Sequence, residues 1–105
     1  MSYGSYLNRI LERFYRYEWD EAKNAGNVEK HKGFELSDGI AVFLDNAKVI
    51  KKDERFDYGE SRYIVIGNVD GTVLFVCFTP RGFFKRRLIS VRRASKQERR
   101  EYYGK

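Results

Sequence analysis

Residues 86–103 read RRLISVRRASKQERREYY, and this stretch decides the fold because it predicts a strand that runs directly into a helix. Its first part, as far as Ala94, places apolar strand formers between arginines. Ser95 followed by Glu98 has the spacing of a capping box, which indicates that a helix starts here. We therefore expect a strand over residues 86–94 and a C-terminal helix that ends on two tyrosines.

The positive charge of the chain is concentrated in the same region. Residues 81–105 contain ten Lys or Arg and two acids, a net charge of +8, whereas residues 1–80 contain eleven and thirteen, a net charge of −2. Seven of the ten cations are arginines, which bind phosphate through two parallel hydrogen bonds. Clustered cations attract polyanions, so a nucleic-acid partner is favoured. A solvated helix face would show the same cations over residues 96–100, and both interpretations stay open there.

Further strands are predicted upstream of this region. The runs over 62–69 and 72–79 are rich in apolar strand formers, and Asp70-Gly71 between them is a strong hairpin signal. A strand over 48–55 precedes them. Consecutive strands with short connections form an antiparallel meander, here of about four strands, and the continuous apolar runs imply burial on both faces.

The first half of the chain predicts mainly helices. Residues 4–14 place Leu7, Ile10, Leu11 and Phe14 on one helical face. Residues 15–19 resemble a strand, and Asp20 then caps a helix for which Gly33 is expected as the left-handed residue past its end. A short helix follows over 35–44. The expected class is therefore α+β, with the N-terminal helices on one face of the sheet and a C-terminal helix.

Composition narrows the functional classes. A chain of 105 residues makes one domain. Cys77 is the only cysteine and His31 the only histidine, so no internal disulfide and no zinc set are expected. The start of the chain lacks the apolar core of a signal peptide, and no run is long enough to span a bilayer. We expect a cytoplasmic protein with no cofactor and no membrane partner.

Several motifs occur in a fixed order along the chain: WDEAKN at 19–24, KH at 30–31, R-x-x-x-I-G at 62–67, F-T-x-R-G at 78–82, and R-x-I-S-x-R-x-A with E-R-x-x-Y at 87–102. Over about residues 17–103 this set resembles the BrnT toxins of type II toxin–antitoxin systems. The resemblance implies a RelE-like fold and a ribonuclease that arrests translation. It also implies a BrnA antitoxin with a ribbon-helix-helix part, through which the pair would bind its operator DNA.

The chain departs from that family in two places. Residues 1–16 extend beyond the usual start, so we expect a helical extension over 1–16 followed by one toxin domain over 17–105. The usual H-G after the first helix is H-K-G here, with Lys32 inserted after His31.

Metal-free RNA cleavage requires a base for the 2′-hydroxyl, an acid for the leaving oxygen and cations for the developing negative charge. His31 is the first candidate for proton transfer, because its ordinary pKa of about 6.5 suits either role. Arg87 and Arg92 differ in strand parity, so they can share one site only if their strand is bulged or ends nearby. The other catalytic candidates are Lys30, Glu60, Arg62, Arg81 and Tyr102, and the RNA-binding candidates are Arg87, Arg93, Lys96, Arg99 and Arg100.

Three functions fit these residues. The first is an endoribonuclease toxin, and the second is a nucleic-acid-binding module whose arginines only hold phosphates. The third is an interaction subunit whose apolar surface and basic C-terminal helix mainly bind an acidic partner. The residues alone do not separate the first two, because both need the same cations.

Overall fold

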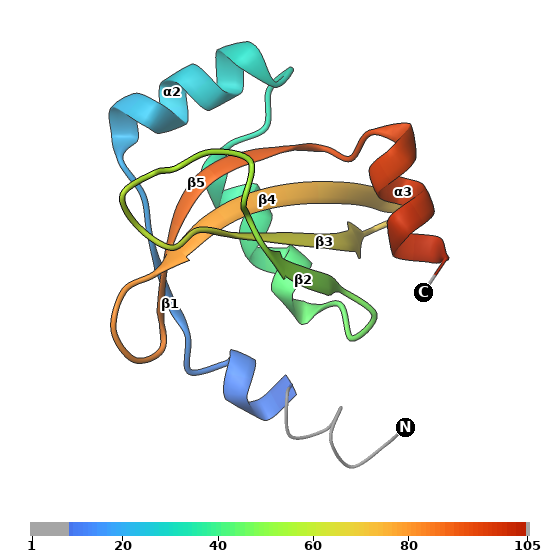
Figure 1. Cartoon of the computed structure of the whole chain (residues 1–105), viewed down its shortest axis with the longest axis horizontal. Coiled ribbons are helices and arrows are strands. Elements are labelled where there is room, and N and C mark those ends of the chain that lie inside the picture. The colour runs from blue at the N-terminus through green and yellow to red at the C-terminus, as the bar shows by residue number, and fades with distance from the viewer. Residues whose placement is uncertain (1–8, 105) are drawn as a thin grey trace.

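The structure, a computed structural model, describes residues 9–104 and contains one five-stranded sheet (Figure 1). The strands lie side by side in the order β1-β5-β4-β3-β2, and the predicted α+β class is confirmed. The elements are, in chain order, β1 (Arg16–Glu18), α2 (Glu21–Lys30), the 3-10 helix η1 (Leu36–Leu44), β2 (Val49–Lys52), β3 (Tyr63–Val69), β4 (Thr72–Pro80), β5 (Lys85–Arg93) and α3 (Lys96–Tyr103).

Strands β2 to β5 form the predicted antiparallel meander. Asp70 and Gly71 have φ angles of 50° and 89°, and positive φ at both positions gives the tight turn whose twist matches the flanking strands. β2 is shorter than the strand predicted over 48–55. The chain turns away from the sheet at Asp53, whose carboxylate accepts the backbone N–H of Arg55 at 3.2 Å.

A parallel edge strand and a helix complete the sheet beside β5. The sequence indicated a strand near residues 15–19 but not the strand with which it pairs. In the structure β1 pairs in parallel with the start of β5, and Glu18 lies opposite Arg87. Farther along β5, the side chain of Asn27 in α2 forms the hydrogen bonds to the edge of the strand. It donates to the carbonyl of Val91 at 2.9 Å and accepts the N–H of Val91 at 3.0 Å. The end of α2 is thereby fixed against the second half of β5.

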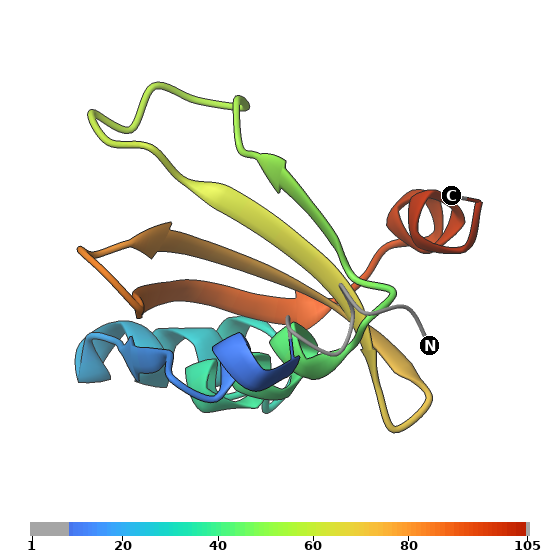
Figure 2. The ribbon, with the colours of Figure 1, turned by 90° about the horizontal axis from the view of Figure 1, so that it is seen from below.

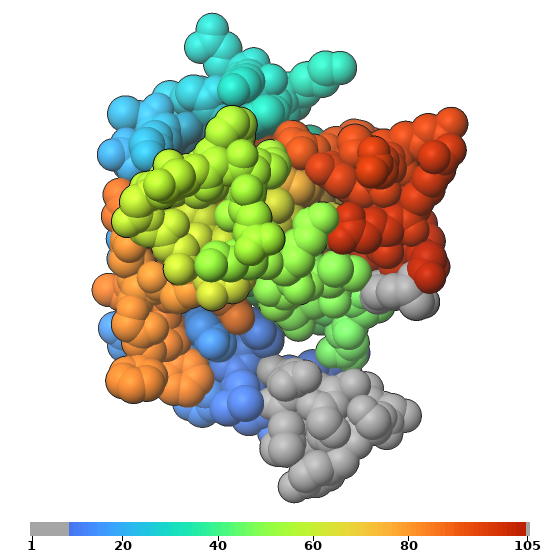
Figure 3. All heavy atoms as spheres, in the orientation of Figure 1, coloured from blue at the N-terminus to red at the C-terminus, as the bar shows by residue number. Residues whose placement is uncertain are grey.

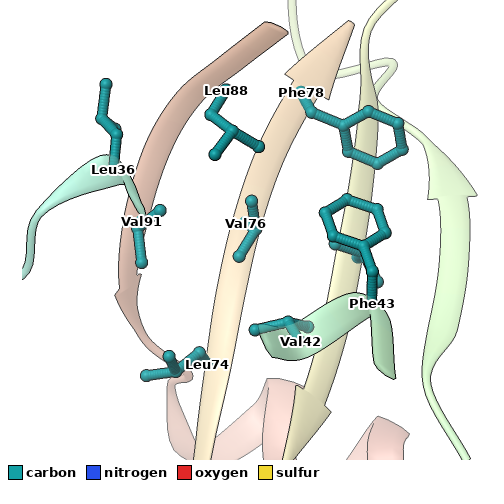
Figure 4. Close-up of a cluster of buried hydrophobic side chains, with 9 residues drawn as sticks. Leu36, Val42, Phe43, Leu74, Val76, Phe78, Leu88 and Val91 are labelled. Carbon is teal, nitrogen blue, oxygen red and sulfur yellow. The ribbon is translucent and has the colours of Figure 1, made fainter. Parts of the chain in front are cut away.

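One face of the sheet is covered by α2 and η1 (Figure 2), as predicted. Leu36, Val42 and Phe43 of η1 are buried against it, as the close-up in Figure 4 shows. Burial of such side chains contributes roughly 1.5–3 kcal/mol each, so this layer is a main source of stability. Its partners on the strands are Val65, Leu74, Val76, Phe78, Leu88 and Val91.

The opposite face has an apolar cluster of its own. Ile64, Ile66, Val73 and Phe75 alternate with the residues that face η1, and α3 closes one end of the cluster through Tyr102. The central strands β3 and β4 are therefore buried on both faces, which explains why their sequences are continuously apolar.

The absence of a side chain at Gly39 lets the 3-10 helix η1 lie directly against the sheet. A Cβ atom at this position would lie 2.9 Å from Cγ2 of Val91 and 3.1 Å from Cγ2 of Val76. The helix predicted over 35–44 is therefore present, and its glycine is required by packing rather than by a turn. No helix within residues 9–104 is long and apolar enough to cross a membrane.

Helix α2 ends one residue earlier than predicted. His31 is its C-cap, and Lys32 rather than Gly33 is the first residue past the cap, with a φ of 53°. The N–H of Gly33 donates to the carbonyl of Val28 at 2.8 Å, which closes the helix in a Schellman-type end. Lys32 and Gly33 both have positive φ, of 53° and 92°, so Gly33 is left-handed as expected and the inserted lysine is left-handed as well.

The segment before β1 packs against β5. Residues 9–12 are helical, whereas residues 4–8 of the helix predicted over 4–14 lie outside the described residues. Glu12 accepts two hydrogen bonds from the buried guanidinium of Arg86, at 2.6 and 3.1 Å. The ring of Tyr15 lies 3.5 Å from the same guanidinium. Residues 9–18 are therefore part of the packed structure.

Candidate functional site

A bulge in β5 decides which way its arginines point. The pairing of β5 with β4 skips Ile89, which is an extra residue in β5. In a regular strand Arg87 and Arg92 would lie on opposite faces, but one extra residue between them restores the same face. Both arginines therefore lie on the sheet face opposite η1. The bulge without which they could not share one site is present.

Arg92 is held rigidly on this face. Its guanidinium lies 3.8 Å from the ring centre of Phe75 and donates two hydrogen bonds to Glu98, at 2.7 and 2.8 Å. Glu98 also accepts the N–H of Ser95 at 2.8 Å, as in the predicted capping box. Burial would raise the pKa of Glu98, but these hydrogen bonds outweigh it and lower the pKa. The start of α3 thus fixes the direction of Arg92.

His31 lies beside Arg92 in a cleft of about 320 Å³. Asn27 brings them together, because it bonds the end of α2 to β5 at Val91. Partial burial lowers the pKa of His31, and the charges of Lys30 and Arg92 lower it further. The imidazole is therefore neutral at neutral pH and can accept a proton. The cleft is lined by Lys30, His31, Lys32, Phe34, Arg92 and Arg93.

Glu60 gathers two more of the predicted cations. It accepts Nε–H of Arg62 at 3.0 Å and Nη2–H of Arg81 at 3.1 Å. The hydrogen bond from Arg62 is the largest of the effects that lower the pKa of Glu60. Glu60 is therefore ionised and anchors two arginines, one just before the start of β3 and one just after the end of β4.

Arg55 connects the two groups of arginines. Its guanidinium lies 5.4 Å from the ring centre of Phe75, beside Arg92, and donates two hydrogen bonds of 2.9 Å to the buried Asp53. Tyr58 donates to the same carboxylate at 3.0 Å, and Arg62 lies 4.2 Å from the ring centre of Tyr58. We call the resulting series of linked cations the arginine row: Arg92, Arg55, Arg62 and Arg81.

Residues 19–98 match the family model described as "Ribonuclease toxin, BrnT, of type II toxin-antitoxin system". The chain belongs to this family. A solved structure agrees: the crystal structure of the Brucella abortus ribonuclease toxin BrnT aligns with 28% sequence identity and a TM-score of 0.59. The alignment covers 78% of this chain and 99% of that one. A comparison with curated proteins gives no match.

The BrnT-matched segment contains most of the site predicted from the sequence. Lys30, His31, Arg92 and Arg93 line one cleft. Glu60, Arg62 and Arg81 form a second group, joined to the first through Arg55. Arg87 lies on the same face as Arg92, but it is paired with Glu18 of β1 at 2.5 Å rather than with the arginine row.

Tyr102 lies apart from the cleft. It is buried, donates a hydrogen bond to Asp45 at 2.5 Å, and has its pKa raised to about 12 by burial and by this carboxylate. It lines a different cleft, together with Asp45 and residues of the β3–β4 turn. Lys96, Arg99 and Arg100 lie on α3, and Arg99 donates to the carbonyl of Ala94 at 2.8 Å.

Sequence reasoning missed Arg55 and the binding of Asn27 to the edge of β5. It named Glu60 and Glu98 but not their ion pairs with the arginines, and it did not single out Asp53. Arg55 lies in a loop without periodicity, and only its spacing from Asp53 offered a signal. In residues 9–104 no three His, Cys, Asp or Glu side chains gather in a way that could hold a metal ion.

Proposed function

We propose that this BrnT-family chain is an endoribonuclease toxin that cleaves RNA without a metal ion, in the cytoplasm, and so inhibits translation. The observation that carries the proposal is the cleft in which His31, with a lowered pKa, lies beside Arg92. A neutral imidazole and a fixed guanidinium are the proton acceptor and the anion stabiliser that this reaction needs.

In the proposed reaction, His31 accepts the proton of a ribose 2′-hydroxyl, and the freed oxygen attacks the adjacent phosphorus. Arg92 and Arg93 stabilise the negative charge that develops on the phosphate oxygens. Lys30 in the same cleft gives a proton to the 5′-oxygen as its bond to phosphorus breaks. The products are a 2′,3′-cyclic phosphate and a free 5′-hydroxyl. The arginine row binds the backbone of the RNA beyond the cleaved bond.

The test is cleavage of RNA by purified protein in excess EDTA, for wild type and for Arg92→Gln. We expect activity in EDTA, and a loss of about 100-fold or more in Arg92→Gln, because one such donor typically contributes that much. Lys51→Gln is the matched control, since Lys51 also pairs with a carboxylate of α3, Glu101 at 3.0 Å, but lies on β2, which is separated from β5 by two strands. Cleavage that EDTA abolishes, or full activity in Arg92→Gln, would contradict the proposal.

A second function is favoured by one observation. Arg92, Arg62 and Arg81 are each paired with a carboxylate, so they are partly neutralised. A binding module that only holds RNA, or that holds an acidic partner, would tolerate this neutralisation. In the same assay such a module would bind RNA and leave it intact in wild type as well as in the variant.

A further inference from the structure

The connection between β4 and β5 ends in two adjacent phenylalanines with different surroundings. Phe84 has a φ of 56°, a left-handed conformation that is rare for an aromatic residue. Its ring centre lies 5.3 Å from that of Tyr15 and 6.4 Å from that of Phe14. Phe83 has no such packing in the described part of the chain and is 96% exposed.

The segment before β1 holds this connection in place. The N–H of Arg16 donates to the carbonyl of Phe84 at 2.7 Å, and Figure 3 shows the two segments side by side, orange against blue. A left-handed aromatic residue persists only where its surroundings fix it, and such strain is concentrated at functional positions. The consequence here is that Phe84 is anchored and Phe83 is directed into solvent.

The surroundings of Phe83 are cationic. Arg81 and Lys85 flank it in the chain, and Arg16 is exposed beside Phe84. The acids in this region already have partners: Glu12 binds Arg86, Glu18 binds Arg87 and lies 3.7 Å from Lys85, and Glu60 binds both Arg62 and Arg81. The arginines and lysines still outnumber these acids. An exposed ring in such a setting suits a ligand that is both planar and anionic.

We propose that Phe83 stacks against an unpaired base of single-stranded RNA whose backbone follows the arginine row. Arg81 belongs to both features, because it is the last member of the row and stands two residues before Phe83. An aromatic ring next to phosphate-binding arginines is how proteins bind single strands without reading their sequence. The inference rests on the proposed function and adds a binding position remote from the cleft.

The test is the affinity for a 2′-O-methyl RNA of mixed sequence, which lacks the attacking hydroxyl and stays intact. Phe83→Ala should bind about 5- to 100-fold more weakly than wild type, and Phe83→Trp should bind at least as well. The salt dependence should be unchanged in Phe83→Ala and shallower in Arg81→Gln, because only the second variant loses a phosphate contact. Leu44→Ala removes another exposed apolar side chain and should bind as wild type does.

Equal affinity of Phe83→Ala and wild type would overturn the inference. So would a defect of Phe83→Ala that is confined to neutralisation by a protein partner, since the connection would then be a protein-binding surface. Failure of the proposed function looks different, because wild type would then bind 2′-O-methyl RNA without cleaving unmodified RNA. Since Phe83 is exposed, the melting temperature of Phe83→Ala should match that of wild type.

Discussion

At the scale of single residues, each arginine of the row is held by a carboxylate. Glu98 holds Arg92, Asp53 holds Arg55, and Glu60 holds the two others. The carboxylates reduce the net charge of the surface, but they fix the direction of every guanidinium before RNA arrives. A preorganised side chain loses less conformational entropy on binding. This gain in affinity offsets part of the affinity that is lost because the carboxylates neutralise the arginines.

His31 gives a prediction at this scale. Its pKa is lowered by burial and by two cations. As the pH rises, the imidazole therefore loses its proton at a pH below about 6.5, the ordinary pKa of histidine. Activity that needs the neutral form should rise with pH through this lowered pKa. Arg92→Gln removes one of the cations and should move the titration of His31 to higher pH.

Because His31 is the only histidine in the chain, one imidazole resonance in an NMR titration reports its pKa directly. Lys51→Gln should leave that resonance where it is. A His31 pKa above 6.5 in wild type, or one that does not change in Arg92→Gln, would contradict the electrostatic role given to Arg92.

At the scale of elements, η1 depends on one glycine. Gly39→Ala should destabilise the protein by about 1–3 kcal/mol, because the new Cβ would overlap Val91 and Val76 in a filled core. Gly26→Ala in α2 is the matched control, since a Cβ atom there would meet no other atom within 4 Å and alanine favours a helix by up to about 1 kcal/mol. Urea denaturation measures both. Equal stabilities of the two variants would contradict the packing described for η1.

The elements themselves were largely predictable, because they follow from local patterns. The capping box of Ser95 and Glu98, the Asp70-Gly71 turn and the apolar runs of β3 and β4 each act within a few residues. The parallel pairing of β1, the bulge at Ile89 and the contact between Arg55 and Phe75 were not predictable. They depend on residues far apart in the chain, and no local pattern encodes their distances.

At the scale of the whole molecule, basic residues gather on the sheet face opposite η1 and around the cleft beside it. A BrnA-like antitoxin that covers this surface would block RNA and neutralise the excess charge. Expression of the chain alone should therefore arrest growth, and expression together with such an antitoxin should restore it. The measurement is growth after induction, with Arg92→Gln as the control that should bind the antitoxin without arresting growth. Vigorous growth with folded, unpartnered wild type would argue against a toxin.

The order in which the chain is made bears on when the site can exist. Glu12 binds Arg86, and Asn27 binds Val91, so these residues find their partners only after a much later part of the chain has been synthesised. Contacts of such long range form late in folding. His31 leaves the ribosome well before Arg92 does, and β1 has no partner strand until β5 has appeared. A nascent chain that has not yet exposed β5 therefore carries no assembled cleft, and the cleft can form only after Arg92 has left the ribosome.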